Sequence, residues 1–283
     1  MESVRLCLVD GTYELFRAFY GAPSRLSPAE VEVGASIALG RSLRSLAKSG
    51  DFSHFAVAFD SVIQSFRNEL FDGYKTGEGI EPTLLAQFAL AERVSEALGF
   101  VVFRMIEFEA DDALATAAAQ VRDRADVSEV IIASPDKDLR QCVGGKVRTW
   151  DRMRDIYYDT EAVVEKMGVT PEQVPDYLAL VGDSADGIPG VPRFGARSTA
   201  AVLSRWKHLE DIPRELSAWD IKVRGAKSLV EQLRAHEEEV LLYRRLATLR
   251  QDVELPVGFD EMRYDGPNEE ALAMLSHELG ARL

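Results

Sequence analysis

Acidic residues recur at the ends of short apolar runs in this sequence, where they could do chemistry together. Three such runs are each followed closely by an aspartate: Asp10, Asp60 and Asp136. A single aspartate after a strand is commonly a turn residue or a helix N-cap. Independent turn residues need not follow successive strands, however, so the repetition favours one shared site.

Further acids extend this pattern. The complete set has nine members: Asp10, Asp60, Glu109, Asp111, Asp112, Asp136, Asp138, Asp183 and Asp186. Nine carboxylates in one cleft would repel one another unless cations neutralised them. Their oxygen-only chemistry suits Mg²⁺ or Mn²⁺, and two such ions can hold both the attacking and the leaving oxygen of a phosphoryl displacement. Two alternatives stay open: Asp111 and Asp112 could complement a helix dipole, and Asp136 and Asp138 could lie in a solvated turn.

The apolar runs alternate with helical patterns in the first half of the chain. Strands are predicted at 4–9, 54–59, 100–103 and 129–133, and helices at 15–20, 33–47, 83–98 and 110–124. This alternation predicts a parallel α/β sheet, whose ligands bind beyond the carboxyl ends of the strands. Strand signals stop after Tyr157, and residues 170–283 are expected to be mainly helical. A boundary is expected near residues 160–175.

Composition limits the class of protein. The 283 residues are 46% hydrophobic and 28% charged, which suits one large domain or two modest ones and excludes wholesale disorder. No apolar run reaches the ~18 residues that a membrane helix needs. The first ten residues reach an acid before a signal peptide could form, and two cysteines are too few for a disulfide framework. A cytoplasmic protein is therefore expected.

The charge distribution bears on nucleic-acid binding. A net charge of -14 argues against it when taken alone, because phosphate contacts need Lys and Arg. Residues 187–209, however, contain no acid and include Arg193 and Arg197. A glycine-punctuated loop that runs into a helix N-terminus can present backbone N–H groups to an anion. The pattern is equally compatible with a DNA-gripping helix–hairpin–helix loop and with a packing loop that carries a solvated arginine face.

Together these residues resemble the bacterial 5′–3′ exonuclease and flap endonuclease family. The resemblance runs over essentially the whole chain, through the segments 8–11, 59–60, 66–67, 74–75, 109–112, 134–138, 182–192 and 246–256. It implies an α/β fold with a PIN-like parallel sheet, flanking helices and a helical arch over about 76–107, all within residues 1–170. Residues 171–283 would form a helical DNA-binding domain with a helix–hairpin–helix (three-turn) loop at about 182–207. The chain would be a stand-alone relative of the N-terminal nuclease domain of DNA polymerase I.

The resemblance also implies an activity. Such enzymes are structure-specific 5′ nucleases that hydrolyse DNA phosphodiesters at 5′ ends and 5′ flaps with two, in some cases three, divalent ions, for replication and repair. One ion would lie on the residues matching Asp10, Asp60, Glu109 and Asp111, and the second on those matching Asp136, Asp138 and Asp183. Asp112 and Asp186 match outer acids. Lys75 matches a lysine that contacts the scissile phosphate, so Lys75, Asp10 and Asp136 are the expected catalytic residues.

Nucleic-acid contacts are implied in the same way. The expected residues are Phe16, Arg67, Lys75, Gly190, Arg193, Gly195, Arg197, Ser198 and Thr199. Phe16 would pack against a terminal base, although a core aromatic remains the alternative. The loop 187–195 would also bind K⁺ through its carbonyls. Expected substrates are 5′ flaps, nicked or gapped duplexes and RNA–DNA hybrids; the chain is expected to be monomeric, away from membranes, and functionally linked to a DNA polymerase and a ligase.

Two positions depart from the family pattern. Glu78 stands where the family commonly has an arginine, three residues after the arch lysine, and Arg193 stands where it usually has glycine. An acid at position 78 would repel the phosphate and weaken the threading of long flaps. A weakly active or non-catalytic branched-DNA binding protein therefore stays open. So does a PIN-like ribonuclease, which has a related sheet and acid cluster. PIN-like ribonucleases are usually shorter and lack the second, helical domain.

Overall fold

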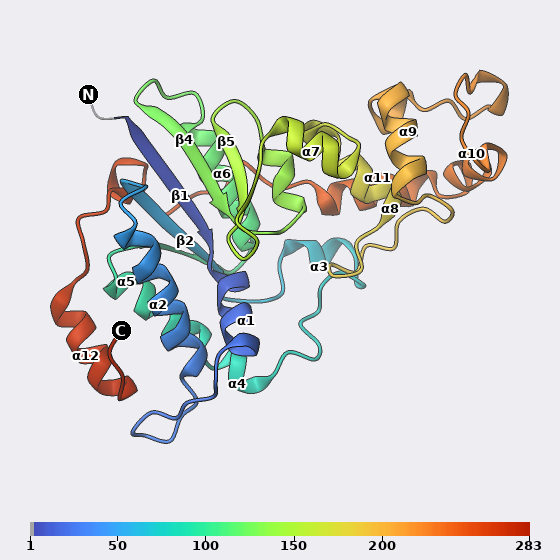
Figure 1. Cartoon of the computed structure of the whole chain (residues 1–283). Helices are drawn as coiled ribbons and strands as arrows, with labels where there is room; N and C mark the ends of the chain where they lie inside the picture. Colours follow the sequence, from blue (N-terminus) through green and yellow to red (C-terminus); the bar gives the residue numbers. More distant parts are fainter. Residues whose placement is uncertain (1–2) are drawn as a thin grey trace. The chain divides into compact units, whose positions relative to one another are not determined.

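The computed structural model describes residues 3–283, which form two compact units (Figure 1). The first, here called the sheet unit, comprises the residues up to Ser65, Gly77–Ser134 and Arg250–Leu283. The second, the helix-rich unit, comprises Phe66–Thr76 and Pro135–Leu249. The chain therefore leaves the sheet unit twice and returns to it. This division differs from the continuous segments 1–170 and 171–283 that the sequence suggested.

Four parallel strands form the centre of the sheet unit. In the order β3-β2-β1-β4 they are β3 (Val101–Met105), β2 (His54–Asp60), β1 (Val4–Asp10) and β4 (Val127–Ala133). Every residue of β2 is buried, as expected of a parallel strand that is covered on both faces and therefore almost continuously apolar. All four predicted strands are confirmed.

The sheet unit also contains helices, several of which contact these strands. They are α1 (Gly11–Gly21), α2 (Gly34–Lys48), α4 (Pro82–Leu85), α5 (Phe88–Ala97), α6 (Ala110–Val121) and α12 (Glu269–Leu279), with a short 3-10 helix η5 (Asp260–Met262). The alanine-rich α6 contacts all four strands, because small side chains allow its backbone to approach the sheet closely. Helix α2 packs against α1 and α5. Figure 1 shows α1 continuing directly from the end of β1.

The predicted helical arch over residues 76–107 is wrong in its extent. Helix α5 lies within this range and buries Phe88, Ala91 and Val94 against its own unit. Strand β3 also lies within it and pairs with β2. These elements are parts of the folded core, so only the segment before α5 is left for an arch.

The helix-rich unit has its own hydrophobic core, built around Val163, Leu178, Leu203 and Leu246. Its α-helices are α3 (Phe66–Leu70), α7 (Thr160–Met167), α8 (Val174–Val181), α9 (Ala196–Trp206), α10 (Ala226–Ala235) and α11 (Glu237–Ala247). Its 3-10 helices are η1 (Asp138–Cys142), η2 (Pro171–Gln173), η3 (Leu209–Asp211) and η4 (Leu216–Ala218).

This unit also contains an antiparallel hairpin that sequence reasoning missed. Strands β5 (Val147–Asp151) and β6 (Ile156–Tyr158) pair across a turn that Asp151 stabilises by accepting from the N–H groups of Met153 and Arg154, each at 3.1 Å. Strand β6 has only 3 residues, and Arg148 interrupts the apolar pattern of β5. Within residues 3–283 no helix is both long enough and apolar enough to span a bilayer.

Candidate metal centre and nucleic-acid loop

Asp10 is the last residue of β1 and the N-cap of α1. One carboxylate oxygen accepts from the Tyr13 N–H at 2.8 Å, and the other accepts from the Ser134 hydroxyl at 2.8 Å. Its exposed fraction is 6%. Asp10 is therefore held at the carboxyl end of a central strand, with its orientation set by a serine at the end of the neighbouring strand β4.

Asp60 is held in the same manner at the end of β2. Its carboxylate accepts from the Ala110 N–H at 2.8 Å, and its own N–H donates to the Thr12 hydroxyl at 2.8 Å. The first contact places Asp60 against the N-terminus of α6, where Glu109 and Asp111 lie. The helix dipole favours negative charge at this end. Glu109 accepts from the Ser65 hydroxyl at 2.7 Å and is also buried.

Asp112 has a structural role at the start of α6. Its exposed fraction is 0%, and its two carboxylate oxygens accept from the N–H groups of Glu109, at 3.0 Å, and Arg250, at 2.9 Å. The first of these bonds completes a capping box at the start of α6. Asp112 therefore caps α6 and fastens the returning chain at Arg250, and its place among the outer acids of the metal site stays a prediction.

Three acids of the helix-rich unit converge on one point. Asp138, Asp183 and Asp186 each offer a carboxylate oxygen, and these oxygens all lie within 4.8 Å of one another. Asp138 and Asp183 are buried, at 5% exposure each. Asp136 is exposed and accepts from the Asp138 N–H at 2.9 Å, so it lies beside the same group.

The electrostatics of this acid cluster are those of a site that needs a cation. Burial, together with the charges of Asp136, Asp186 and Asp183, raises the pKa of Asp138 well above its ordinary value. One buried oxygen of Asp138, Oδ1, has no hydrogen-bond partner among the described residues. Burial alone would lower the pKa of Lys137, but its ion pair with Asp183 and the nearby Asp138 raise it. One lysine does not balance four carboxylates.

Lys75 lies beside this cluster. Its backbone N–H donates to the Asp186 carbonyl at 3.0 Å, and the Asn68 side chain donates to the carbonyls of Tyr74 and Lys75. Gly187 allows the two segments to approach: a Cβ at this glycine would lie 2.1 Å from the Gly73 carbonyl oxygen. The structure thus brings together Lys75 and the acids of one predicted ion site.

The predicted DNA contact at Arg67 is wrong. Arg67 is 1% exposed, and its guanidinium donates to the carbonyls of Leu246, at 2.8 Å, and Thr248, at 3.1 Å. A side chain enclosed in this way cannot reach a phosphate. Arg67 instead ties α3 to the end of α11, across a sequence separation that no local pattern reveals.

The predicted hairpin loop joins α8 to α9 and is tightly packed. A Cβ at Gly190 would lie 2.5 Å from the Gly182 N, and Gly190 has a φ of 71°. Arg193 also has a positive φ, 75°, in the region that favours glycine. Gly195 is the N-cap of α9 and is exposed, as are Arg193 and Arg197. The loop therefore presents two arginines and a helix N-terminus to solvent.

Three other residues were predicted to contact DNA: Thr199, Ser198 and Phe16. Thr199 is 0% exposed and its N–H donates to the Gly195 carbonyl at 2.9 Å, so neither its side chain nor its N–H is open to DNA. The Ser198 hydroxyl accepts from the Gly195 N–H at 3.0 Å and so closes the cap of α9. Phe16 is half-buried and packs edge-to-face on Phe88, with ring centroids 6.2 Å apart. A base contact at Phe16 stays a prediction.

Sequence reasoning missed the side chains that orient the acids. Thr12, Ser65 and Ser134 each form a hydrogen bond that fixes a predicted ligand or its backbone, and Lys137 pairs with Asp183. Ser134 and Lys137 lie inside a recognised motif, which was the available signal. No sequence signal pointed to Thr12 or Ser65, because hydroxyl residues after strands are common.

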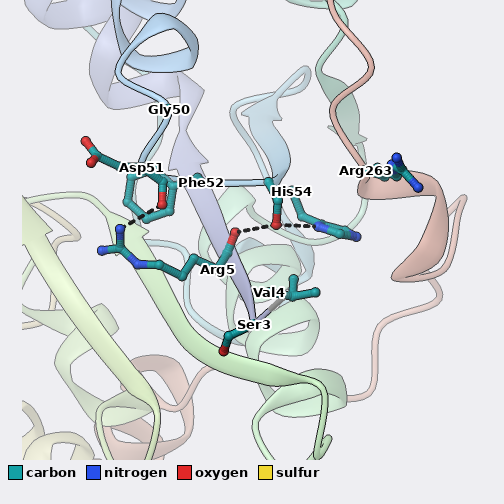
Figure 2. A pocket seen from close by; sticks show the side chains of 9 residues that line it. Ser3, Val4, Arg5, Gly50, Asp51, Phe52, His54 and Arg263 are labelled. Atoms are coloured by element: carbon teal, nitrogen blue, oxygen red, sulfur yellow. Dashed lines mark hydrogen bonds between the residues drawn. The ribbon is translucent and has the colours of Figure 1, made fainter. Parts of the chain in front are cut away.

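A separate cavity of about 570 Å³ lies at the opposite, amino ends of β1 and β2 (Figure 2). Its lining includes Arg5, His54 and Arg263, and the Ser53 hydroxyl lies 3.0 Å from His54 Nδ1. Burial, and then the charge of Arg263, lower the pKa of His54 below its ordinary value. None of the predicted site residues lines this cavity, which is therefore distinct from the acid sites.

Comparison with known families decides the relationship. The profile described as "5'-3' exonuclease, N-terminal resolvase-like domain" matches residues 5–168, and "5'-3' exonuclease, C-terminal SAM fold" matches residues 169–270. The chain belongs to the 5′–3′ exonuclease family. The predicted fold class, an α/β nuclease domain followed by a helical domain, is confirmed with it.

Curated relatives of this 5′–3′ exonuclease family member include two kinds of protein. It is 35% identical to the DNA polymerase I of Pseudomonas aeruginosa, over 99% of this chain and 31% of that protein. It is 28% identical to the 5'-3' exonuclease of Aquifex aeolicus, over 97% of this chain and 91% of that protein. The chain thus spans about a third of the DNA polymerase I relatives that it matches.

Solved structures share the fold. The T5 D15 protein co-crystallised with metal ions superposes with a TM-score of 0.69 at 21% identity, covering 86% of this chain and 89% of that one. The catalytic core of Rad2 in complex with DNA substrate superposes with a TM-score of 0.62 at 14% identity, covering 98% and 88%. At such identities the superpositions support the fold alone.

Proposed function

We propose that this chain is a metal-dependent, structure-specific 5′ nuclease that hydrolyses DNA phosphodiesters at 5′ ends and 5′ flaps, in replication and repair. The observation that carries the proposal is the acid cluster of Asp138, Asp183 and Asp186, with one buried Asp138 oxygen lacking any hydrogen-bond partner among the described residues. Buried carboxylates at such separations are destabilising unless a cation binds them.

The donor set fits hard divalent cations. Asp136, Asp138, Asp183 and Asp186 offer only oxygen, as Mg²⁺ and Mn²⁺ prefer. In the sheet unit a further ion would be held by Asp10, Asp60, Glu109 and Asp111. The family resemblance allows a third ion as well. When bound, such ions supply Lewis acidity next to the scissile phosphate and offset the charge that develops on it.

The chain's own residues would bind and orient the DNA. The ammonium of Lys75, anchored beside Asp186, would attract the scissile phosphate and hold it near the acids. Arg193 and Arg197, at the positive N-terminal end of α9, would bind the backbone of a duplex without reading its sequence. Ser134 and Ser65 would keep the carboxylates of Asp10 and Glu109 in fixed orientations, which reduces rearrangement when an ion binds.

The test uses a duplex with a 5′-labelled single-stranded flap, incubated in Mg²⁺, in Mn²⁺ and in EDTA. We expect metal-dependent cutting near the junction that falls about hundredfold or more in Asp138→Asn. In EDTA the same variant should be more stable than the wild type, by roughly 1 kcal/mol, because it removes one of the mutually repelling buried charges. Thermal unfolding in EDTA and in Mn²⁺ measures the stability of the two proteins, which should change in the direction opposite to the cleavage rate.

The matched control is Asp220→Asn. Asp220 is exposed, pairs with Arg205 on the surface and carries the same charge change. It should leave both cleavage and the response to Mn²⁺ unchanged. Equal cleavage by wild type and Asp138→Asn would contradict the proposed site, whatever nuclease activity remained.

A second candidate is a weakly active or non-catalytic branched-DNA binding protein. The exposed Glu78, three residues after Lys75, favours it because an acid there repels phosphate. Intact flap binding with no cutting in either metal would establish this candidate. Cutting of an RNA flap in preference to a DNA flap would instead indicate a PIN-like ribonuclease.

Finer features are proposed on the family resemblance. Nicked or gapped duplexes and RNA–DNA hybrids would also be substrates. K⁺ would bind the carbonyls of the loop 187–195 and tighten duplex binding relative to Na⁺. The protein would act as a cytoplasmic monomer, handing its products to a DNA polymerase and a ligase.

A further inference from the structure

Lys137 lies between two acids of the predicted metal site in the sequence and contacts a third in the structure. It stands between Asp136 and Asp138, and its ammonium forms an ion pair with Asp183. Its backbone is fixed at the start of η1, where its carbonyl accepts from the Arg140 N–H at 3.1 Å. The chain therefore brings a cation of its own to the acid cluster.

The carboxylate of Asp183 is held in place through both of its oxygens. The Asp183 N–H donates to the Ile188 carbonyl and the Asp183 carbonyl accepts from the Ile188 N–H, each at 2.8 Å, so the backbone is fixed. One carboxylate oxygen, Oδ1, accepts from the Ala185 N–H at 3.0 Å. The other, Oδ2, contacts the Lys137 ammonium. The oxygen that Asp183 has left for a metal ion is therefore the one that Lys137 holds.

Asp138 shows the opposite condition. Its buried Oδ1 has no hydrogen-bond partner among residues 3–283. Asp138 and Asp183 nevertheless belong to one cluster, in which the carboxylate oxygens lie within 4.8 Å of one another. A divalent ion bound to Asp138 would therefore meet the Lys137 ammonium at Asp183, and two cations so close repel each other. Binding of the ion at both carboxylates requires the ammonium to move away.

The side chain of Lys137 is able to move in this way. It is 37% exposed, whereas the side chain of Asp183 is 5% exposed. Lysine carries a compact, strongly hydrated ammonium on a flexible stem, so water can take up the ammonium without any change in the surrounding fold. A guanidinium in its place would hold a carboxylate in a rigid planar fork. The residue type therefore suits an exchangeable counter-ion better than a permanent ion pair.

We propose that Lys137 competes with the divalent ion for Asp183. Without an ion, the ammonium stabilises the acid cluster; when an ion binds, the ammonium leaves Asp183 for solvent, and part of the binding free energy of the ion is used in displacing it. Lys137 thus raises the ion concentration at which this site fills. It acts through Asp183, so it is a positioning residue and not a catalytic one. This inference rests on the metal site of the proposed function.

The experiment measures Mn²⁺ binding without DNA, at constant pH and ionic strength, from the electron paramagnetic resonance signal of free Mn²⁺. Lys137→Met removes the charge and keeps most of the side-chain length. We expect it to bind the Mn²⁺ of this site about tenfold more tightly than the wild type, because no ammonium has to be displaced. In EDTA it should unfold at a lower urea concentration, because the carboxylates lose their counter-charge. Lys137→Arg, which keeps the charge, should bind Mn²⁺ no more tightly than the wild type.

Two further variants separate competition from other effects of the lysine. Asp183→Asn removes the carboxylate for which the two cations compete, so adding Lys137→Met to it should change Mn²⁺ binding far less than Lys137→Met does alone. Lys166→Met is the matched control, because Lys166 is an exposed lysine on α7 of the same unit and undergoes the same loss of charge. It should change neither the affinity for Mn²⁺ nor the stability in EDTA.

Mn²⁺ binding by Lys137→Met that is equal to that of the wild type, or weaker, would overturn the proposal. A gain of the same size in Lys166→Met would also overturn it, because net charge alone would then explain the effect. Asp138→Asn tests the metal site of the proposed function separately: it should lose the Mn²⁺ of this site whether or not Lys137 competes for Asp183. If Asp138→Asn bound Mn²⁺ as the wild type does, the proposed site itself would be wrong.

Discussion

Arg193 stands in a backbone conformation that favours glycine, at a φ of 75° in the loop before α9. An L-residue there costs about 1 kcal/mol relative to glycine. Its exposed guanidinium has an evident compensating use if the loop grips DNA. We therefore expect Arg193→Gly to raise the unfolding free energy by roughly 0.5–1 kcal/mol and to weaken duplex binding several-fold. Urea unfolding and a duplex titration measure the two effects.

Arg197→Gln is the variant to compare with Arg193→Gly. It removes the same charge from the same exposed loop region, but in ordinary helical backbone. It should weaken duplex binding without the gain in stability. If Arg193→Gly and Arg197→Gln changed stability alike, the strain argument at Arg193 would be wrong.

The β5–β6 hairpin depends on one carboxylate. Burial alone would raise the pKa of Asp151, but hydrogen bonds from the Arg154 side chain and from the backbone of Arg154 and Met153 lower it below its ordinary value. A lowered pKa means that the folded state prefers the carboxylate, so this stabilisation is full above pH ~4 and is lost as the pH falls through the lowered value. We expect Asp151→Ala to cost about 1–2 kcal/mol at pH 7 and markedly less at pH 3.

Urea unfolding followed by tryptophan fluorescence would measure this, because Trp150 stacks on Tyr157 within the hairpin. Asp123→Ala is the control, since the Asp123 side chain is 95% exposed. It should show no loss at either pH. A cost for Asp151→Ala that stayed constant from pH 7 to pH 3 would exclude the charged form as the source of the stability.

The turn at Gly77–Gly79 tests whether a local charge limits flap entry. Both glycines have positive φ, at 74° and 86°, and Glu78 between them is exposed. We expect Glu78→Arg to speed the cleavage of long flaps several-fold, because it replaces repulsion of the strand by attraction next to Lys75. Flaps of one or two nucleotides should be cut at the original rate. Rates on flaps of graded length are the measurement.

Glu81→Arg gives this prediction its control. Glu81 is exposed, lies three residues further on and undergoes the same change of charge. An equal gain in the two variants would point to the general charge of the segment and not to position 78. No gain from Glu78→Arg would mean that threading is not limited by this acid.

At the scale of the molecule, the strands and the acids after them were predictable because buried parallel strands are continuously apolar and their carboxyl ends share one edge. The family resemblance separated Asp111 from Asp112 as an inner and an outer acid, but the full burial of Asp112 depends on the rotation of α6, which the sequence does not show. The role of Arg67 was hidden because its carbonyl partners lie about 180 residues away. Long-range hydrogen bonding therefore sets the limit of sequence reasoning here.

The net charge of -14 makes DNA binding by this chain depend on cations. If two divalent ions occupy the acid sites, the net charge becomes -14 + 4 = -10. The added positive charge lies at the acid sites, where it would attract a substrate phosphate. We expect the flap substrate to bind roughly tenfold more tightly in Ca²⁺ than in EDTA at equal ionic strength, and Asp138→Asn to lose part of this gain. Fluorescence anisotropy measures it. A gain equally large in Asp138→Asn would mean that the ions act by general screening, because a screening effect does not require the buried carboxylate.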